Sequence, residues 1–149
     1  MPSLTKAFEI LLLEDEPADA YLVQLAIRES KINANISHLQ DGREGLDYLR
    51  CMPPYTTTTP PDLILLDINM PRMNGREFLS NVKMDAQLKN IPVVILTTSD
   101  VERDINTSYR LGACGYITKP VEFSQLIDVM NQLSAYWFEL VRLPNHNLA

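Results

Sequence analysis

The sequence has few of the residues that build disulfide-linked or metal-bound scaffolds. Its 149 residues include two cysteines, Cys51 and Cys114, and two histidines, His38 and His146. The cysteines lie far apart and show no metal-ligand spacing, so we expect two reduced thiols that fill packing space. His38 falls in a predicted strand and His146 in a polar tail. A triad of nucleophile, histidine and acid is therefore not expected.

Long apolar runs and an excess of positive charge are also lacking. The longest apolar run near the N-terminus, Ile10 to Leu13, is followed at once by acids, which argues against a signal peptide or a membrane span. Lysine and arginine number 13 against 19 aspartates and glutamates, giving a formal charge of −6. That balance disfavours a nucleic-acid partner. We expect one cytoplasmic domain with its own core, in contact with neither membrane nor nucleic acid.

Short aliphatic runs recur along the chain. The runs at 10–13, 63–66 and 93–96, and a shorter one at 116–117, do not alternate with polar residues. Strands covered on both faces, as in a parallel sheet, have this pattern. Residues 34–39 alternate and form a weaker candidate at or near an edge of the sheet.

Helical patterns lie between and after these runs. The first helix follows the acids after Leu13, the second follows Asp41-Gly42, and the third starts near Asn74-Gly75. The fourth ends at Gly112, and the fifth runs from Phe123 to Trp137. Repeated strand–helix units predict an α/β fold with a doubly wound, five-stranded parallel sheet in the flavodoxin-like order 2-1-3-4-5. The Pro/Thr-rich stretch 51–61 is predicted to be a solvated loop before the third strand.

The carboxyl ends of the predicted strands carry polar side chains. The first strand is followed by Glu14, Asp15 and Glu16, the third by Asp67, the fourth ends in Thr97, and the fifth is followed by Lys119. Strands one, three, four and five are neighbours in the predicted order, so these groups should meet in one crevice. Clustered carboxylates favour a cation, and oxygen ligands suit Mg²⁺. Beside Mg²⁺, Asp67 can act as a nucleophile toward phosphorus while Lys119 holds a phosphoryl oxygen.

Four motifs carry a resemblance to a known family. They are LLLED, LILLDINMPRMNG, VVILTTS and GYITKP, in order and at the family's spacing over about residues 8–136. The sequence resembles a receiver domain of the bacterial two-component response regulators, the CheY-like superfamily. In more detail it is similar to the single-domain regulators of cyanobacterial phytochromes. The features shared with those regulators are LLLEDEPADA, the Pro/Thr-rich loop, IPVVILTTS and a tail of the form WFELVRLP.

The resemblance implies a phosphoacceptor and a metal site. Asp67 would accept the phosphoryl group. Mg²⁺ would be bound directly by Asp15, Asp67 and the backbone carbonyl of Asn69, and through water by Glu14. The acidic pair is Glu-Asp where the family often has Asp-Asp, a variant that we expect to keep metal binding.

The resemblance also implies the residues that respond to phosphorylation. Thr97 would bond the phosphoryl group and Lys119 would pair with it, with a cis bond to Pro120 turning the lysine toward the crevice. Tyr116 occupies the position of the switch aromatic, although packing is an alternative role for it. Thr98 is bulkier than the family's frequent Ala or Gly and is expected to alter access to the site.

The C-terminal segment is expected to extend the last helix. A single receiver domain would span 1–149, with a core at about 8–136 and an extension at 137–149. Trp137 and Phe138 would either cover the domain's own core or form a dimer surface, and we favour the dimer. The resemblance places such a homodimer on the face made by the fourth helix, fifth strand and fifth helix.

The predicted function is transfer of a phosphoryl group from a sensor histidine kinase, by resemblance a phytochrome, to Asp67. With no basic helix-turn-helix in the sequence, we expect a switch of protein contacts and no turnover of other substrates. Three alternatives remain. They are a receiver-like module that works without phosphate, a haloacid-dehalogenase-type phosphatase, and a flavodoxin. The phosphatase needs an acid where Asn69 stands, and Glu14 to Glu16 would repel a flavin phosphate.

Overall fold

The computed structural model describes the backbone of residues 7–140 and side chains as far as Trp137. Strands and helices alternate along this part of the chain, as the sequence predicts. They are β1 (Phe8–Leu13), α1 (Pro17–Glu29), β2 (Ala34–Leu39), α2 (Gly42–Leu49), β3 (Leu63–Leu66), α3 (Gly75–Met84), β4 (Val93–Thr97), α4 (Glu102–Arg110), β5 (Gly115–Thr118) and α5 (Phe123–Ser134). A π-helical segment, η1 (Ala135–Leu140), continues α5, so the predicted extension of the last helix is confirmed to residue 140.

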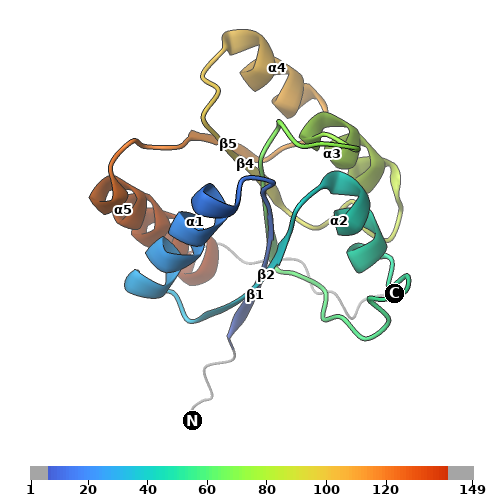
Figure 1. Ribbon diagram of the computed structural model, residues 1–149, viewed down its shortest axis with the longest axis horizontal. Helices are drawn as coiled ribbons and strands as arrows, with labels where there is room; N and C mark the ends of the chain where they lie inside the picture. Colours follow the sequence, from blue (N-terminus) through green and yellow to red (C-terminus); the bar gives the residue numbers. More distant parts are fainter. Residues whose placement is uncertain (1–6, 141–149) are drawn as a thin grey trace.

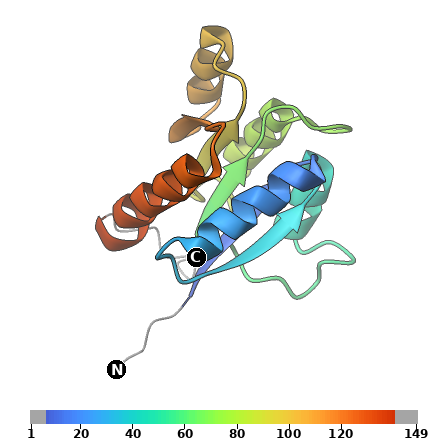
Figure 2. The same cartoon turned by 60° about the vertical axis from the view of Figure 1, so that its left-hand side comes forward.

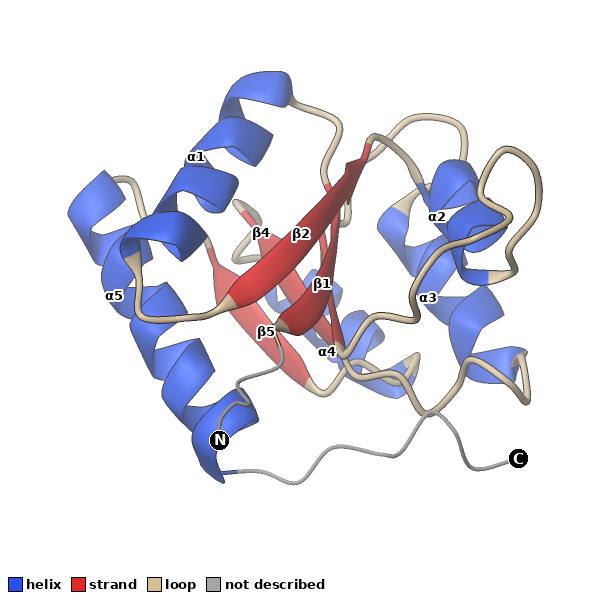
Figure 3. Cartoon of the chain, turned by 90° about the horizontal axis from the view of Figure 1, so that it is seen from below, coloured by secondary structure: helices blue, strands red, loops and turns tan. Residues whose placement is uncertain are grey.

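The strands form one parallel sheet in the predicted order β2-β1-β3-β4-β5. Figure 3 shows this sheet between two groups of helices. Leu13 pairs with Leu66, and Leu66 pairs with Ile95. The carboxyl ends of β1 and β3 are therefore level, β4 continues past them to Thr97, and the residues at these ends lie along one edge of the sheet.

Apolar side chains alternate between the two faces of the sheet. Leu11, Leu13 and their neighbours pack beneath α2 and α3, whereas Ile10 and Leu12 pack beneath α1 and α5. Figure 1 shows these two helix pairs on opposite sides of the sheet, and Figure 2 shows α1 and α5 side by side. Burying one such side chain contributes ~1.5–3 kcal/mol to stability. The strands are thereby fixed supports for the polar residues at their ends.

The start of α3 shows how closely the backbone packs near Asp67. Asn74 caps the helix: its side chain accepts a bond from the Glu77 N–H, and the Glu77 side chain accepts one from the Asn74 N–H. A Cβ atom on Gly75 would lie 2.4 Å from the carbonyl oxygen of Asp67 and 2.7 Å from the Cα of Ile68. Only glycine fits there, since real Cβ contacts are not so short.

Two expectations about side-chain packing fare differently. Cys51 and Cys114 are free thiols, but both are exposed, so the prediction that they fill packing space is wrong. Cys51 lies in the loop after α2, and Cys114 immediately precedes the edge strand β5. Trp137 is half-buried against the cluster beneath α1 and α5, which favours the alternative that it covers the domain's own core. The side chain of Phe138 lies outside the described residues. No helix within 7–140 is both long and apolar enough to cross a membrane.

Candidate functional site

Three carboxylates meet where the sequence predicts a crevice. Oxygen atoms of Glu14, Asp15 and Asp67 all lie within 4.8 Å of one another. Glu14 is 1% exposed and Asp67 9%, whereas Asp15 is open to solvent. This all-oxygen set, closed on one side and accessible on the other, matches the preference of a hard divalent cation that keeps several water ligands.

Lys119 binds Glu14 more closely than it binds Asp67. Its Nζ donates a hydrogen bond to Glu14 Oε1, lies 3.5 Å from Asp19 Oδ2 and lies 3.8 Å from Asp67 Oδ2. The lysine side chain is only 9% exposed. Burial alone would lower the pKa of Lys119, but the bond to Glu14 and the three nearby carboxylates outweigh burial and raise it. Lys119 is therefore a fixed positive charge among the acids.

Glu14 has an unusual acidity for a glutamate. Burial, which is the largest cause, and the neighbouring Asp67 carboxylate together raise its pKa to about 7, against the lowering effect of Lys119. A cation placed between Glu14 and Asp67 would oppose these effects, since a nearby positive charge favours the ionised form of both acids. The site is thus electrostatically suited to bind a cation.

Asp67 is held in a defined orientation by Thr97. The Thr97 hydroxyl, which is fully buried, donates a 2.8 Å bond to Asp67 Oδ1, and the Asn69 N–H approaches the same oxygen at 3.3 Å. The N–H of Asp67 donates to the carbonyl of Leu13 at 3.0 Å. As predicted, Thr97 thus lies beside Asp67. Asn69 itself is exposed at the rim of the crevice.

The cis bond predicted between Lys119 and Pro120 is wrong. The cis peptide in the part of the chain that the structure describes is Pro53–Pro54. Lys119 instead continues the β5 ladder, its N–H donating to the carbonyl of Thr97 at 2.7 Å. From this trans backbone the Lys119 side chain reaches Glu14.

Tyr116 packs against the core, and its role as a switch aromatic stays a prediction. Its ring is half-buried against the cluster beneath α2 and α3, and its hydroxyl donates a 2.8 Å bond to the carbonyl of Ser99. Tyr116 therefore packs and also contacts the loop that follows Thr97. Thr98 is exposed beside Thr97, and its effect on access to the crevice stays a prediction.

Sequence patterns missed several residues that support the site. His38 Nε2 lies 2.7 Å from the carbonyl oxygen of Glu14, and Asp19 lies beside Lys119. Asp104, at the start of α4, accepts bonds from the Ser99 hydroxyl and from Arg76. These bonds, the Ser99 bond most of all, lower the pKa of Asp104. Only Asp19, four residues after Asp15 at a helix start, carried a spacing that could have revealed it.

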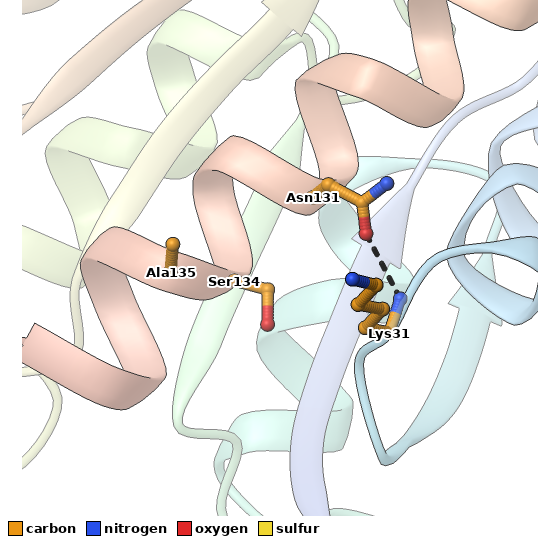
Figure 4. A pocket seen from close by; sticks show the side chains of 4 residues that line it. All are labelled: Lys31, Asn131, Ser134 and Ala135. Carbon is orange, nitrogen blue, oxygen red and sulfur yellow. Dashed lines mark hydrogen bonds between the residues drawn. The ribbon is translucent and has the colours of Figure 1, made fainter.

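A second hollow, of about 370 Å³, lies away from this crevice. Figure 4 shows its lining residues, which are Lys31, Asn131, Ser134 and Ala135. The backbone N–H of Lys31 donates to Asn131 Oδ1 at 3.0 Å. The hollow lies near the amino end of β2 and contains no acid, histidine or cysteine, so it offers neither a metal site nor a nucleophile pair.

Comparison with known proteins agrees with this geometry. The family sequence model for the response regulator receiver domain matches residues 10–131. Response regulator Rcp1 of Synechocystis sp. is 40% identical over 135 residues, which cover 91% of this chain and 92% of that protein. Protein PilH of Pseudomonas aeruginosa is 32% identical over 126 residues, which cover 85% of this chain and 97% of that protein.

Solved structures agree as well. A phosphorylated cyanobacterial phytochrome response regulator, RcpA, superposes with a TM-score of 0.88 at 41% identity, covering 94% of this chain and all of that one. The Mn²⁺-bound form of Rcp1 superposes with a TM-score of 0.84 at 39% identity, covering 93% and 99%. This chain therefore belongs to the response regulator receiver domain family, which works in phosphorylation-based two-component signalling.

Proposed function

We propose that Asp67 accepts a phosphoryl group from a phosphohistidine of a sensor kinase. The observation that carries this proposal is the setting of the Asp67 carboxylate. Thr97 orients its Oδ1, Lys119 Nζ lies 3.8 Å from its Oδ2, and two further acids lie within 4.8 Å. Phosphoryl transfer depends mainly on positioning and on neutralising charge, and this crevice offers both.

The metal that fits the crevice is Mg²⁺. Asp15, Asp67 and the backbone carbonyl of Asn69 would hold it directly, and Glu14 would hold it through water. These ligands are hard oxygens, and the exposed side at Asp15 and Asn69 leaves room for water. When bound, Mg²⁺ supplies neutralisation of the charge on the phosphoryl oxygens.

The residues of this chain have separate tasks in the proposed reaction. A carboxylate oxygen of Asp67 forms a bond to phosphorus as the phosphorus–nitrogen bond of the phosphohistidine breaks, and the electron pair stays on the imidazole nitrogen. Lys119 then pairs with the transferred phosphoryl group, and the Thr97 hydroxyl donates to it. Attack of water on phosphorus later returns the carboxylate and free phosphate. Thr98 controls the access of that water and of phosphodonors.

The upstream partner that we propose is a phytochrome kinase. Support comes from RcpA and Rcp1, relatives at about 40% identity, one of which is described as a cyanobacterial phytochrome response regulator. Phosphorylation would take place in the cytoplasm and would change contacts at the α4–β5–α5 face, where Tyr116 lies. We also propose a homodimer on this face, although Trp137 packs against the domain's own core.

The test is phosphorylation by acetyl phosphate followed by intact mass, with and without Mg²⁺. We expect the mass of one phosphoryl group with Mg²⁺ and none without it. Asp67→Asn should abolish the gain, whereas Asp128→Asn, a matched change on the exposed side of α5, should preserve it. A gain that survives Asp67→Asn would reject Asp67 as acceptor. No gain with folded protein, from acetyl phosphate or from a phytochrome kinase, would favour a phosphate-independent module.

A further inference from the structure

A chain of side-chain contacts connects α3 and α4 to the loop that follows Thr97. Arg76, on the first turn of α3, pairs with Asp104 Oδ1 on the first turn of α4. Asp104 Oδ2 accepts a 2.7 Å bond from the Ser99 hydroxyl. The carbonyl of Ser99 in turn accepts the Tyr116 hydroxyl at 2.8 Å.

Ser99 is the centre of this network because its backbone and side chain hold different partners. Its side chain is fixed by Asp104, and its N–H approaches Thr97 Oγ1 at 3.5 Å. Its hydroxyl oxygen also lies 3.4 Å from the N–H of Val101. Fixing the Ser99 side chain therefore fixes the carbonyl that binds Tyr116 and the backbone next to Thr97.

We infer that Arg76 and Asp104 are positioning residues for the phosphoryl response, an inference that rests on the proposed function. They hold the loop 98–101 in the arrangement in which Thr97 already faces Asp67. They also hold the Tyr116 hydroxyl at the Ser99 carbonyl. The loop is thus pre-organised for a phosphoryl group on Asp67, and less free energy is needed to order it when that group arrives.

The geometry of the Arg76–Asp104 pair supports a role beyond that of a surface ion pair. The Asp104 side chain is only 13% exposed and uses both oxygens, one for the guanidinium and one for the Ser99 hydroxyl. The Ser108 hydroxyl also donates to the Asp104 carbonyl at 2.8 Å. A fully exposed pair would contribute little, but a largely buried carboxylate that bonds two partners at once favours one loop conformation.

The first test measures binding of beryllofluoride, a phosphoryl analogue, with Mg²⁺ by amide NMR titration. Asp104→Asn and Arg76→Gln should each weaken beryllofluoride binding about fivefold to tenfold. Glu102→Gln also removes an acid from the first turn of α4, but Glu102 is exposed, so this variant should change beryllofluoride binding less than about twofold. Mg²⁺ affinity without beryllofluoride should be the same in all variants, because the network does not touch the metal-binding acids.

The second test separates positioning from a general loss of stability. Tyr116→Phe removes the hydroxyl that donates a hydrogen bond to the carbonyl of Ser99. In a Tyr116→Phe background, Asp104→Asn should weaken beryllofluoride binding by a smaller factor than it does in the native chain, because both changes break one network. Losses that multiply fully, or variants that bind beryllofluoride as the native chain does, would overturn the inference. A native chain that binds no beryllofluoride would instead overturn the proposed function itself.

Discussion

Asp67 begins the loop after β3, and Thr97 ends β4 directly before the next loop, but the two loops are held in place by different kinds of contact. The loop after β3 is fixed chiefly through its backbone. Gly75 N–H donates to the carbonyl of Ile68 at 2.8 Å, Gly42 N–H donates to the carbonyl of Met73 at 3.0 Å, and Asn74 caps α3. The loop after β4 is fixed chiefly by side chains, through Ser99 and its partners Asp104 and Tyr116.

This difference matches the tasks proposed for the two loops. A nucleophile must keep its position to within a fraction of an ångström, which backbone bonds and close backbone packing provide. A switch needs two arrangements of similar free energy, and side-chain bonds can be exchanged without breaking the sheet. In the proposed function, the loop after β3 is therefore the rigid phosphoacceptor loop, and the loop after β4 is the adjustable response loop.

The largest expected effect comes from breaking the backbone-held loop at Gly75. Gly75→Ala would place a Cβ 2.4 Å from the Asp67 carbonyl, so either α3 or the Asp67 backbone must move. We expect the free energy of unfolding to fall by about 2–4 kcal/mol. We also expect phosphorylation by acetyl phosphate to fall sharply. Urea denaturation and intact mass measure the two effects.

The matched control for Gly75 is Gly115. A Cβ there would lie 3.5 and 3.6 Å from the two methyl groups of Val94, which is ordinary contact. Gly115→Ala should therefore change the free energy of unfolding by less than about 1 kcal/mol. Equal losses for the two variants would show that backbone packing at Gly75 is not what holds the Asp67 loop.

The second-largest effect is expected from Thr97, the last residue of β4, directly before the response loop. Thr97→Val keeps the shape of the side chain but removes the 2.8 Å bond to Asp67 Oδ1. We expect phosphorylation to slow about tenfold to hundredfold, as when one donor to a developing charge is lost. Stopped phosphorylation time courses measure this rate.

Thr97→Ser keeps the hydroxyl and is the control. It should retain most of the native phosphorylation rate. The free energies of unfolding of both variants should lie within about 1 kcal/mol of that of the native chain. If Ser and Val reduced the rate equally, the Thr97 methyl and not its hydroxyl would be the important group. The contrast between the two loops would then not rest on side-chain hydrogen bonds after β4, since Thr97 would act through packing.

The fold and the central site followed from the sequence, because they depend on periodic patterns and on strand ends. Unbroken aliphatic runs indicated a parallel sheet, and its strand order brought Glu14, Asp67 and Lys119 together. The sequence could not reveal that Lys119 binds Glu14 most closely, or that its bond to Pro120 is trans. The bond between Lys119 and Glu14 joins two residues far apart in the sequence, and no local pattern encodes which of several acids the lysine contacts. The contact of Arg76 with Asp104 joins two helices whose relative placement no local pattern encodes.

A smaller effect is expected from the side-chain contact that joins the loop after β3 to the start of α2. Arg72 donates to Asp41, which is 4% exposed and also caps α2 through the N–H of Glu44. Asp41→Ala should lower the free energy of unfolding by about 1–2 kcal/mol through loss of the cap. The phosphorylation rate should stay native, because the Gly42–Met73 backbone bond remains.

Asp41→Asn separates the two roles of this carboxylate. It keeps an oxygen that can cap α2 but loses the charge that pairs with Arg72, so it should cost less stability than Asp41→Ala. Thermal unfolding and the acetyl phosphate rate are measured side by side. A phosphorylation rate that fell with either change would mean that a side chain, as in the loop after β4, also positions Asp67.

The smallest expected effect concerns His38, which extends the comparison to the acidic end of β1. A carbonyl oxygen can only accept, so the 2.7 Å contact with Glu14 requires a proton on His38 Nε2. The imidazole thereby fixes the backbone that presents Glu14 and Asp15. A neutral hydrogen bond contributes ~0.5–1.5 kcal/mol, so His38→Leu should weaken Mg²⁺ binding about twofold to tenfold, measured by calorimetry. His38→Gln, which offers an amide donor at similar reach, should restore most of the affinity. If His38→Leu and His38→Gln had the same Mg²⁺ affinity, the backbone bond from the Glu14 N–H to the Leu39 carbonyl would be enough to hold the carboxyl end of β1. The end of β1 would then be held by backbone contacts, as the loop after β3 is.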